Sequence, residues 1–343
     1  MKSMMKSSAA ALAIGIALAG AAMAQDYTLR IAHAGPATME NDDYVGSTTL
    51  KEIIEANSDG RIAVDIYPGN QLGSYEEVME QVNANALEVA HVSIGGVTPF
   101  VPELSVVDLQ YILPNDEVAY AFMEGPFTDE IRDAVMAQLP NTRLVAVSDG
   151  GRWRSFFTTK PVQTAADLEG MKIRTISSPL QQEFVASLGA AATPVAWGEL
   201  YTALSTGVVD GTKNGTPDIM SNKFNEVVSH VILDRHTFLF GYYFISDEWL
   251  NALPEDLQTV VLDGFTEAAA RQTEFNAETE DAANAAFEEA GGTIYTPTEA
   301  DRETFLGARQ AMQDWYVEKY GEEWLQKMLD AVSEAEAAVA AKN

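Results

Sequence analysis

Alternating apolar and polar positions near the start of the chain predict short strands, and apolar positions at helical spacing between them predict helices. The expected order is strand, helix, strand, helix, strand over residues 27–33, 42–57, 61–67, 75–86 and 89–94. Ser74 is placed to cap the second of these helices. This order is typical of a parallel sheet with helices on its faces.

Ligands of such sheets bind at the carboxyl ends of the strands. His33 ends the first predicted strand, Gly35 follows it, and Ser93 lies near the end of the third. These residues are therefore candidates for ligand contact, although a turn or core role also explains each of them singly.

A second series of strands and helices follows in the next part of the chain. It is expected over residues 144–147, 171–176, 179–188, 192–195, 198–205 and 208–210. Residues 230–245 are β-branched and aromatic, which favours strands that return between two lobes. Further helices are expected over 129–139, 254–291, 299–320 and 322–341. Because no low-complexity linker separates the two series, crossing strands or a long helix should join the lobes.

The expected fold class is therefore α/β with parallel or mixed sheets in two lobes. The roughly 319 residues that follow the leader exceed what one hydrophobic core usually covers. We assign residues 25–150 plus about 240–280 to lobe I, and residues 151–239 plus about 281–343 to lobe II.

Residues 1–24 have the pattern of a secretory signal peptide. Lys2 and Lys6 precede an apolar core of about 12 residues, and Ala22 to Ala24 form a small-residue cleavage site. The core is shorter than the roughly 20 residues that span a bilayer, so export without stable membrane insertion is expected. The chain has no cysteine, which excludes disulfides, thiol catalysis and a lipidated N-terminal cysteine. The expected location is the periplasm, after cleavage behind Ala24.

The formal net charge is −30, and loss of Lys2 and Lys6 with the leader makes it −32. Such a charge excludes nucleic acid as a partner, because phosphate binding needs a basic face. The same field repels small anions, so an anion site in this protein must act through cations close to the ligand.

One stretch concentrates the scarce basic residues. Five of the 21 lysines and arginines fall within 23 residues, beside three aromatic side chains; the five are Arg152, Arg154, Lys160, Lys172 and Arg174. In an acidic protein this concentration predicts a pocket for an anion. The alternative is a run of charge on the surface.

No motif for catalysis or cofactor binding is present. The sequence lacks a phosphate-binding loop, the GxGxxG fingerprint, HExxH and GxSxG. The four histidines are scattered, so neither a metal site nor a cofactor is predicted. A periplasmic enzyme whose site has no motif stays open as an alternative.

Three blocks of sequence resemble the DctP-type solute receptors of tripartite ATP-independent periplasmic (TRAP) transporters. They are Ser58-Asp59-Gly60-Arg61-Ile62 with Gln71-Leu72-Gly73, then Lys160-Pro161-Val162 with Gly170-Met171-Lys172-Ile173-Arg174, and Trp197-Gly198-Glu199-Leu200-Tyr201 running into Val209-Asp210-Gly211. The similarity extends over nearly the whole chain after the leader. It implies a Venus-flytrap fold in which two lobes close on the ligand.

The resemblance also implies roles for individual residues. Arg174 matches the arginine that pairs in a bidentate manner with the ligand's carboxylate, and Asn214 matches the asparagine that donates its amide to the same group. Lys213 stands where many members have an acid, which would suit a more strongly anionic group, a sulfonate or a second carboxylate. Lys160 and Arg154 are further bases expected near the ligand. Trp197 and Trp153 are expected to wall the cleft or to pack inside the protein.

The function that follows from the resemblance is capture of a small organic anion and its delivery to TRAP membrane subunits, with uptake driven by an ion gradient. An alternative ligand is a zwitterion such as ectoine, held by Arg174 through its carboxylate and by aromatic side chains around its cationic end. A periplasmic enzyme and a sensory adaptor are alternatives of other classes.

Overall fold

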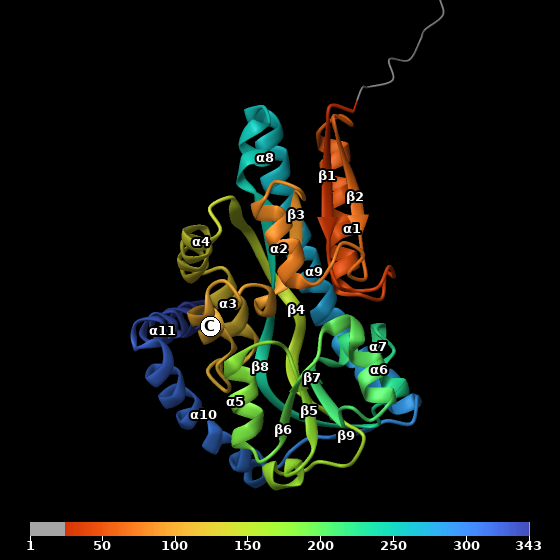
Figure 1. Cartoon of the computed structure of the whole chain (residues 1–343), viewed down its shortest axis with the longest axis vertical. Coiled ribbons are helices and arrows are strands. Elements are labelled where there is room, and N and C mark those ends of the chain that lie inside the picture. Colours follow the sequence, from red (N-terminus) through yellow and green to blue (C-terminus); the bar gives the residue numbers. More distant parts are fainter. Residues whose placement is uncertain (1–24, 343) are drawn as a thin grey trace, which may run out of the picture.

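A single mixed sheet runs through both halves of the molecule (Figure 1). The computed structural model describes residues 25–342, so the predicted leader lies outside the described residues. The strand order is β2-β1-β3-β8-β4-β7-β5-β6, and β9 pairs with β8. The strands are β1 (Tyr27–Ala32), β2 (Ile62–Tyr67), β3 (Val89–Ser93), β4 (Thr142–Thr158), β5 (Lys172–Thr175), β6 (Ala191–Pro194), β7 (Gly211–Asn214), β8 (His230–Ser246) and β9 (Thr293–Tyr295).

Helices cover both faces of this sheet. They are α1 (Asp42–Asn57), α2 (Tyr75–Asn83), α3 (Asp116–Met123), α4 (Phe127–Gln138), α5 (Pro179–Ser187), α6 (Leu200–Ser205), α7 (Thr216–Ser221), α8 (Asp247–Ala252), α9 (Glu255–Glu289), α10 (Glu299–Tyr320) and α11 (Glu323–Lys342). The short helices α3, α7 and α8 are not predicted by the apolar spacing. Within residues 25–342, no helix is both long enough and apolar enough to cross a membrane.

The upper half in Figure 1 is built on β1, β2 and β3, with α1 and the first part of α9 against one face. Its strands pair in parallel, β1 with both β2 and β3. Side-chain caps fix where the helices begin. At α1 the side chain of Asn41 accepts a hydrogen bond from the Tyr44 amide, and at α2 Ser74 and Glu77 form a reciprocal capping box. These caps fix where the loops at the carboxyl ends of the strands turn.

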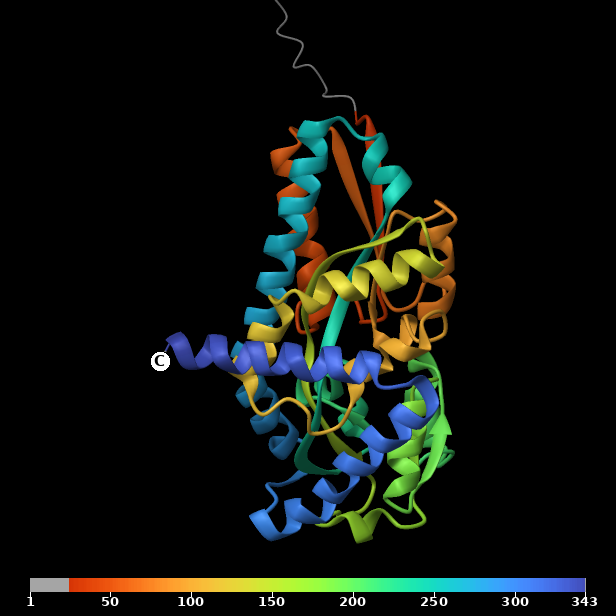
Figure 2. The ribbon, with the colours of Figure 1, turned by 90° about the vertical axis from the view of Figure 1, so that its left-hand side faces the viewer.

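Two 17-residue strands, β4 and β8, cross from one half to the other as an antiparallel pair. Their register shifts between Asp149 and Trp153, where Gly151 and Arg152 have positive φ angles of 126° and 69°. The 35-residue helix α9 runs along the molecule beside them (Figures 1 and 2). The prediction of a two-lobed α/β fold joined by crossing strands and a long helix is confirmed. Where one lobe ends and the other begins stays a prediction, because the sheet is continuous.

The lower half contains β5, β6 and β7 with α5, α6 and α7 around them. Here the predicted strand over 208–210 is wrong, because the strand is Gly211–Asn214. Val209 is fully buried, but its amide donates to Ala203 O in a turn rather than to a neighbouring strand. At the C-terminus, α11 lies across the middle of the molecule against α3 (Figure 2).

Candidate ligand-binding site

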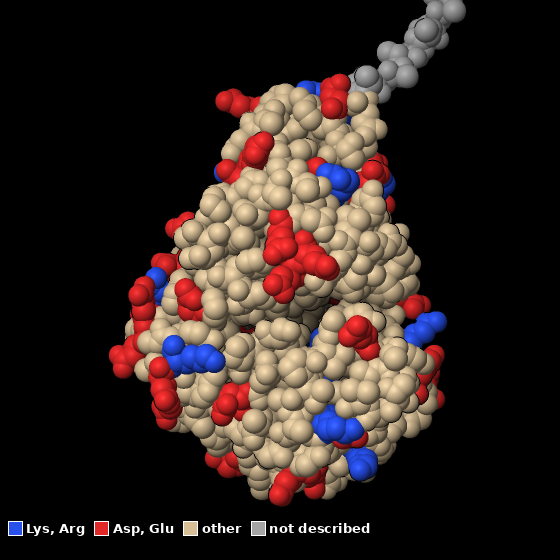
Figure 3. All heavy atoms as spheres, in the orientation of Figure 1, with Lys and Arg blue, Asp and Glu red and all other residues tan. Residues whose placement is uncertain are grey.

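A small polar cavity of about 40 Å³ lies between the two halves, at the carboxyl ends of β3, β5 and β7. The upper half, the crossing strands and the lower half all contribute to its wall. Figure 3 shows this face of the molecule hollowed between the halves, with carboxylates gathered over α2 above the hollow. A ligand in this cavity would touch both halves at once.

Arg174 is a buried cation that lines this cavity, and it has no carboxylate partner among the described residues. Its side chain comes from β5 and is 5% exposed. The Nε atom donates to Val195 O at 3.0 Å, and the guanidinium carbon lies 5.4 Å from the centre of the Trp197 ring. Burial, together with the nearby Arg154, lowers the pKa of Arg174 to about 9. An anion in the cavity would offset the free-energy cost of burying this charge.

Arg154 also lines the cavity, but it has an internal partner. It comes from β4, and its Nη1 atom lies 3.4 Å from both carboxylate oxygens of Asp108. The Nε2 atom of Gln181 donates to the same carboxylate at 2.6 Å. The Nε atom of Arg154 is buried and receives no hydrogen-bond partner from the residues that the structure describes. Asp108 therefore holds Arg154 in place, and the Nε–H group of Arg154 can still donate to a ligand.

Asn214 reaches the cavity from β7, and the two ends of its side-chain amide differ in their hydrogen bonding. Its Nδ2 atom donates to Asp218 at 3.0 Å, and its Oδ1 atom is buried and has no hydrogen-bond partner in the described part of the chain. In this structure the amide nitrogen that the resemblance assigns to the ligand is directed at Asp218 instead. The free group of Asn214 is an acceptor.

An acidic wall, which the sequence alone did not reveal, lies in the same cavity. It consists of Asp43 from the first turn of α1, Asp218 from α7 and the neighbouring His91 from β3. The His91 Nδ1 atom lies 3.1 Å from Asp43, and the Gly35 amide donates to Asp43 at 3.0 Å. These residues are far apart in sequence and carry no shared motif. Only the fold brings them together.

The pKa values of the two carboxylates of this wall are shifted in opposite directions. Burial and the neighbouring Asp42 and Asp43 raise the pKa of Asp218 well above its ordinary value. Burial acts in the same direction on Asp43, but His91 and His33 outweigh it and hold the pKa of Asp43 well below its ordinary value. Asp43 therefore ionises more readily than Asp218.

Two of the candidate residues lie next to cavity residues but face away from the cavity. Lys213 precedes Asn214 in β7, and side chains of successive strand residues point to opposite faces. It is buried against α5, where its Nζ atom donates to Gln181 at 2.6 Å, and burial lowers its pKa well below the ordinary value. Trp153 precedes Arg154 in β4 and donates from its indole to Asp116. Both side chains have packing roles in this structure.

Lys160 and His33 are not brought to the cavity either. Lys160 is exposed on the loop after β4. His33 is buried behind the wall, with its Nδ1 atom 3.7 Å from Asp43. Of the basic stretch, only Arg154 and Arg174 line the cavity.

Trp197 and Tyr75 lie where the inner cavity opens into an outer groove of about 290 Å³. Arg174 and Ile176 line both spaces, whereas Ser93 lines only the inner one. The ring of Trp197 packs edge-on against Phe224 at 5.1 Å and presents its other side to Arg174. Of the residues predicted from sequence, Arg174, Arg154, Asn214, Trp197 and Ser93 are thus brought together. Whether each touches a ligand stays a prediction.

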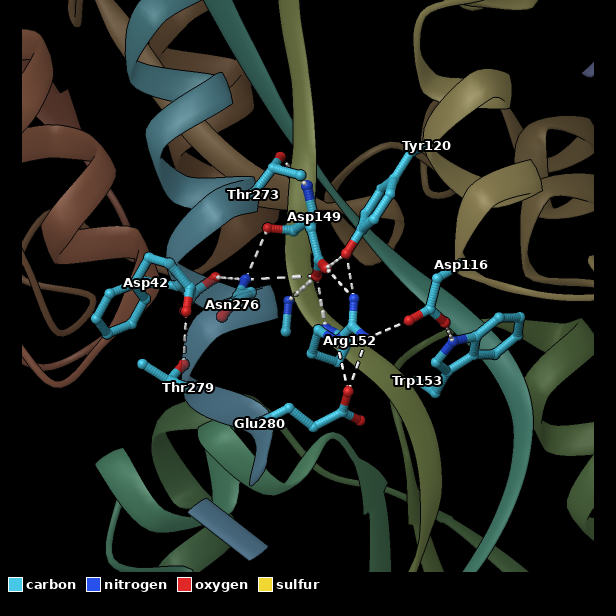
Figure 4. A network of polar contacts seen from close by, with 12 residues as sticks. Asp42, Asp116, Tyr120, Asp149, Arg152, Trp153, Thr273, Asn276, Thr279 and Glu280 are labelled. Atoms are coloured by element: carbon cyan, nitrogen blue, oxygen red, sulfur yellow. Dashed lines mark hydrogen bonds and ion pairs between the residues drawn. The ribbon is translucent and has the colours of Figure 1, made fainter. Parts of the chain in front are cut away.

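The remaining arginine of the basic stretch, Arg152, belongs to a separate network at the crossing strands (Figure 4). Its guanidinium pairs with Asp149 of β4, Asp116 of α3 and Glu280 of α9, the last at 2.7 Å. Asn276 of α9 donates to Asp149 O at 2.9 Å in the same network. We refer to these five residues as the Arg152 network. Because its arginine is paired with three carboxylates of the described chain, the Arg152 network does not offer that cation to a ligand.

Comparisons with known proteins agree with this architecture. The model of the family described as bacterial extracellular solute-binding protein, family 7 (DctP), matches residues 35–323. The C4-dicarboxylate-binding periplasmic protein DctP of Rhodobacter capsulatus is 26% identical over 333 residues, which cover 94% of this chain and 96% of the relative. The ectoine/5-hydroxyectoine-binding periplasmic protein UehA of Ruegeria pomeroyi is 31% identical over 255 residues, which cover 74% of this chain and 73% of the relative.

Among solved structures, a TRAP periplasmic solute binding protein from Roseobacter denitrificans with bound β-D-glucuronate superposes with a TM-score of 0.81 at 29% identity. The superposition covers 89% of this chain and 98% of that protein. The chain therefore belongs to family 7 of the bacterial extracellular solute-binding proteins, the DctP-like receptors of TRAP transporters, which is a family of transport proteins and not of enzymes.

Proposed function

We propose that this protein is a periplasmic receptor that binds a small organic acid between its two halves, with the acid's carboxylate on Arg174, and delivers it to TRAP membrane subunits. The observation that carries the proposal is the burial of Arg174 without a carboxylate partner in residues 25–342. The signal-peptide pattern of residues 1–24 supports export to the periplasm.

A buried, unpaired guanidinium is costly, because burial removes its hydration and no protein anion replaces it. Proteins keep such a group where a ligand supplies the missing charge. A guanidinium presents parallel donors to a planar carboxylate, which fixes the orientation of the ligand as well as its affinity. Arg154, held by Asp108 at 3.4 Å, adds a second donor in the same cavity.

Small organic acids of this kind appear in the names of several related proteins. The Rhodobacter capsulatus relative is a C4-dicarboxylate-binding protein, and the Roseobacter denitrificans structure contains glucuronate. A TRAP solute binding protein from Desulfovibrio salexigens, 25% identical, was solved with bound orotic acid. Each of these ligands offers a carboxylate that a buried arginine can receive.

Ligand binding should favour a closed arrangement of the halves, since one molecule would contact both. The halves already touch at the cavity rim, where Asn41 of the α1 cap donates to Ser221 of α7 at 3.2 Å. The closed surface is what membrane subunits would recognise.

A zwitterion such as ectoine is the second candidate ligand. The observation in its favour is the similarity to the ectoine/5-hydroxyectoine-binding protein of Ruegeria pomeroyi. In such a complex Arg174 would hold the carboxylate, and the Trp197 and Tyr75 rings would face the rest of the molecule.

Thermal unfolding of the chain from Gln25 onward, against a panel of carboxylates, hydroxy acids, sulfonates and zwitterions, tests the proposal. A ligand at a hundred times its Kd adds about 2.7 kcal/mol to the free energy of unfolding. The shift should disappear in Arg174→Met and persist in Lys172→Met, a matched change on the same strand. Within residues 25–342, the Lys172 side chain donates only to Gly207 O. A panel without any shift, or an equal shift in Arg174→Met, contradicts the proposal.

A further inference from the structure

Two amide side chains of α9 lie behind the acidic wall and do not line the cavity themselves. Gln272 and Asn276 are four residues apart on the helix, so they share one of its faces, and both are fully buried. The Nε2 atom of Gln272 donates to Asp42 at 2.8 Å, and the Nδ2 atom of Asn276 donates to the same carboxylate oxygen at 3.1 Å. Figure 4 shows the second of these bonds. Buried amides are costly unless they are hydrogen-bonded, and here both donors hold one carboxylate.

The carboxylate that they hold is next to a cavity residue. Asp42 is the first residue of α1, and Asp43 after it belongs to the acidic wall. Asn276 also donates to Asp149 O at 2.9 Å, and the residue that follows, Gly150, lines the cavity as well. The two amides therefore hold, from behind, two segments of the chain that form the cavity surface.

The other end of the Gln272 amide supports the histidine of the acidic wall. Its Oε1 atom accepts a hydrogen bond from Tyr243 Oη at 2.6 Å. The Tyr243 ring stacks on the His91 ring, with 4.1 Å between the ring centres and 21° between the ring planes. The Nδ1 atom of His91 in turn lies 3.1 Å from Asp43. Both ends of the Gln272 amide thus lead to the pair of His91 and Asp43.

Gly46 makes room for this arrangement. It lies inside α1, where glycine is less favourable than alanine because it loses more backbone entropy on folding. A Cβ atom at this position would clash with the Tyr243 hydroxyl and would lie 3.0 Å from Gln272 Oε1. The close approach of the hydroxyl that bonds Gln272 therefore explains why this helix contains a glycine.

We propose that Gln272 is a positioning residue of the ligand site: it does not touch the ligand, but it holds His91 and Asp43 in the orientation in which they meet it. Asn276 is a second support of the same wall. A side chain that is already held by buried hydrogen bonds loses less freedom when a ligand arrives, so affinity should depend on these bonds. This inference rests on the proposed function, because it takes the ligand to lie in the cavity between the halves.

Calorimetric titration with succinate, D-glucuronate, orotate and ectoine tests the proposal. Gln272→Glu keeps the side-chain size and the acceptor for Tyr243, but it loses the donor to Asp42. Tyr243→Phe is a milder change that removes only the hydroxyl group. Loss of one buried hydrogen bond lowers affinity roughly tenfold. For each acid that the wild type binds, Kd should therefore rise about tenfold in Gln272→Glu and at least about threefold in Tyr243→Phe.

Thr279→Val is the matched control on the same helix. Within residues 25–342, the Thr279 hydroxyl donates only to Phe275 O of its own helix, so this isosteric change should leave Kd within about twofold. If Gln272→Glu does not fold, Tyr243→Phe carries the test on its own.

A double-mutant cycle separates positioning from a general loss of structure. In an Asp43→Asn background, the effect of Gln272→Glu should shrink from about tenfold to within about threefold, because the residue that it positions is already altered. An unchanged Kd in both Gln272→Glu and Tyr243→Phe, or a loss of the same size in the Asp43→Asn background, overturns the positioning role and leaves the proposed function standing. Binding that persists in Arg174→Met overturns the anchor instead. No binding of any of the four acids by the wild type contradicts the proposed function, and the inference that rests on it.

Discussion

The guanidinium of Arg174 lies 5.4 Å from the centre of the Trp197 ring, and its one hydrogen bond within the described residues goes from Nε to Val195 O. A charge held in this way costs folding free energy, because a ring face and one carbonyl replace little of the lost hydration. In the proposed function, an anion bound at Arg174 would offset this cost.

The first prediction concerns that cost. Arg174→Met removes the buried charge and keeps most of the side-chain volume, so the ligand-free variant should be about 1–2 kcal/mol more stable than the wild type. Urea unfolding of the two proteins measures the difference. Lys172→Met, with a partly exposed side chain on the same strand, should show no such gain. A ligand-free Arg174→Met protein that is less stable than the wild type would contradict the cost assigned to this charge.

The second prediction is a pH dependence that comes from Asp149. Burial raises its pKa to about 7 although Arg152 is close by, whereas an unfolded aspartate titrates near about 3.9. The folded protein thus retains a proton that the unfolded chain releases, and this contribution to stability is present at low pH and lost as pH rises toward 7. Between pH 5 and pH 7 the wild type should lose about 1–2 kcal/mol relative to Asp149→Asn. Parallel pH profiles of the two proteins in urea unfolding would show that Asp149 does not titrate in this range.

The third prediction concerns the Arg152 network at the crossing strands (Figure 4). Arg152→Ala would leave Asp149, Asp116 and Glu280 without their common cation, and breaking a buried pair in this way costs about 3–5 kcal/mol. Arg271→Ala is the matched control, because Arg271 pairs with Glu274 and Glu278 on the exposed side of α9, where a pair contributes at most about 1 kcal/mol. Equal losses for the two variants in chemical denaturation would refute a structural role for the network.

The fourth prediction tests how tightly the cavity is packed. A Cβ atom on Gly241 would lie 2.5 Å from His91 Nε2 and 2.7 Å from Ser148 Oγ, both in buried side chains. Gly241→Ala should therefore cost about 1–3 kcal/mol and weaken ligand binding by displacing His91. Gly307→Ala, on the exposed side of α10 with no atom near its Cβ, should stabilise the protein by up to about 1 kcal/mol. A neutral Gly241→Ala variant with unchanged binding would mean that His91 has room to move.

Most elements could be predicted from sequence because local signals agreed with the fold. The helix at 42–57 and the N-cap at Ser74 are examples, and the alternating pattern of residues 27–33 indicated the position of β1. The prediction of a strand at 208–210 was wrong because the apolar Val209 is buried in a turn and not in a strand. The strand is formed instead by the more polar Gly211–Asn214, which pairs with β4 and β5.

The site was only partly predictable for two reasons. Arg174 and Asn214 lie in blocks that resemble the receptor family, but Lys213 and Trp153 are neighbours of cavity residues on the opposite side of their strands. Arg152 is neutralised by Asp116 and Glu280, which are distant in sequence. The residues of the acidic wall come from α1, β3 and α7, so no local sequence pattern predicts it.

The most direct measurement is the crystal structure of the chain from Gln25 onward with its tightest-binding acid. The account predicts that both oxygens of the ligand's carboxylate lie within hydrogen-bond distance of the Arg174 guanidinium, beside the Trp197 ring. A carboxylate held elsewhere, with Arg174 still free of any anion, would contradict the central claim that this buried charge is the ligand's anchor.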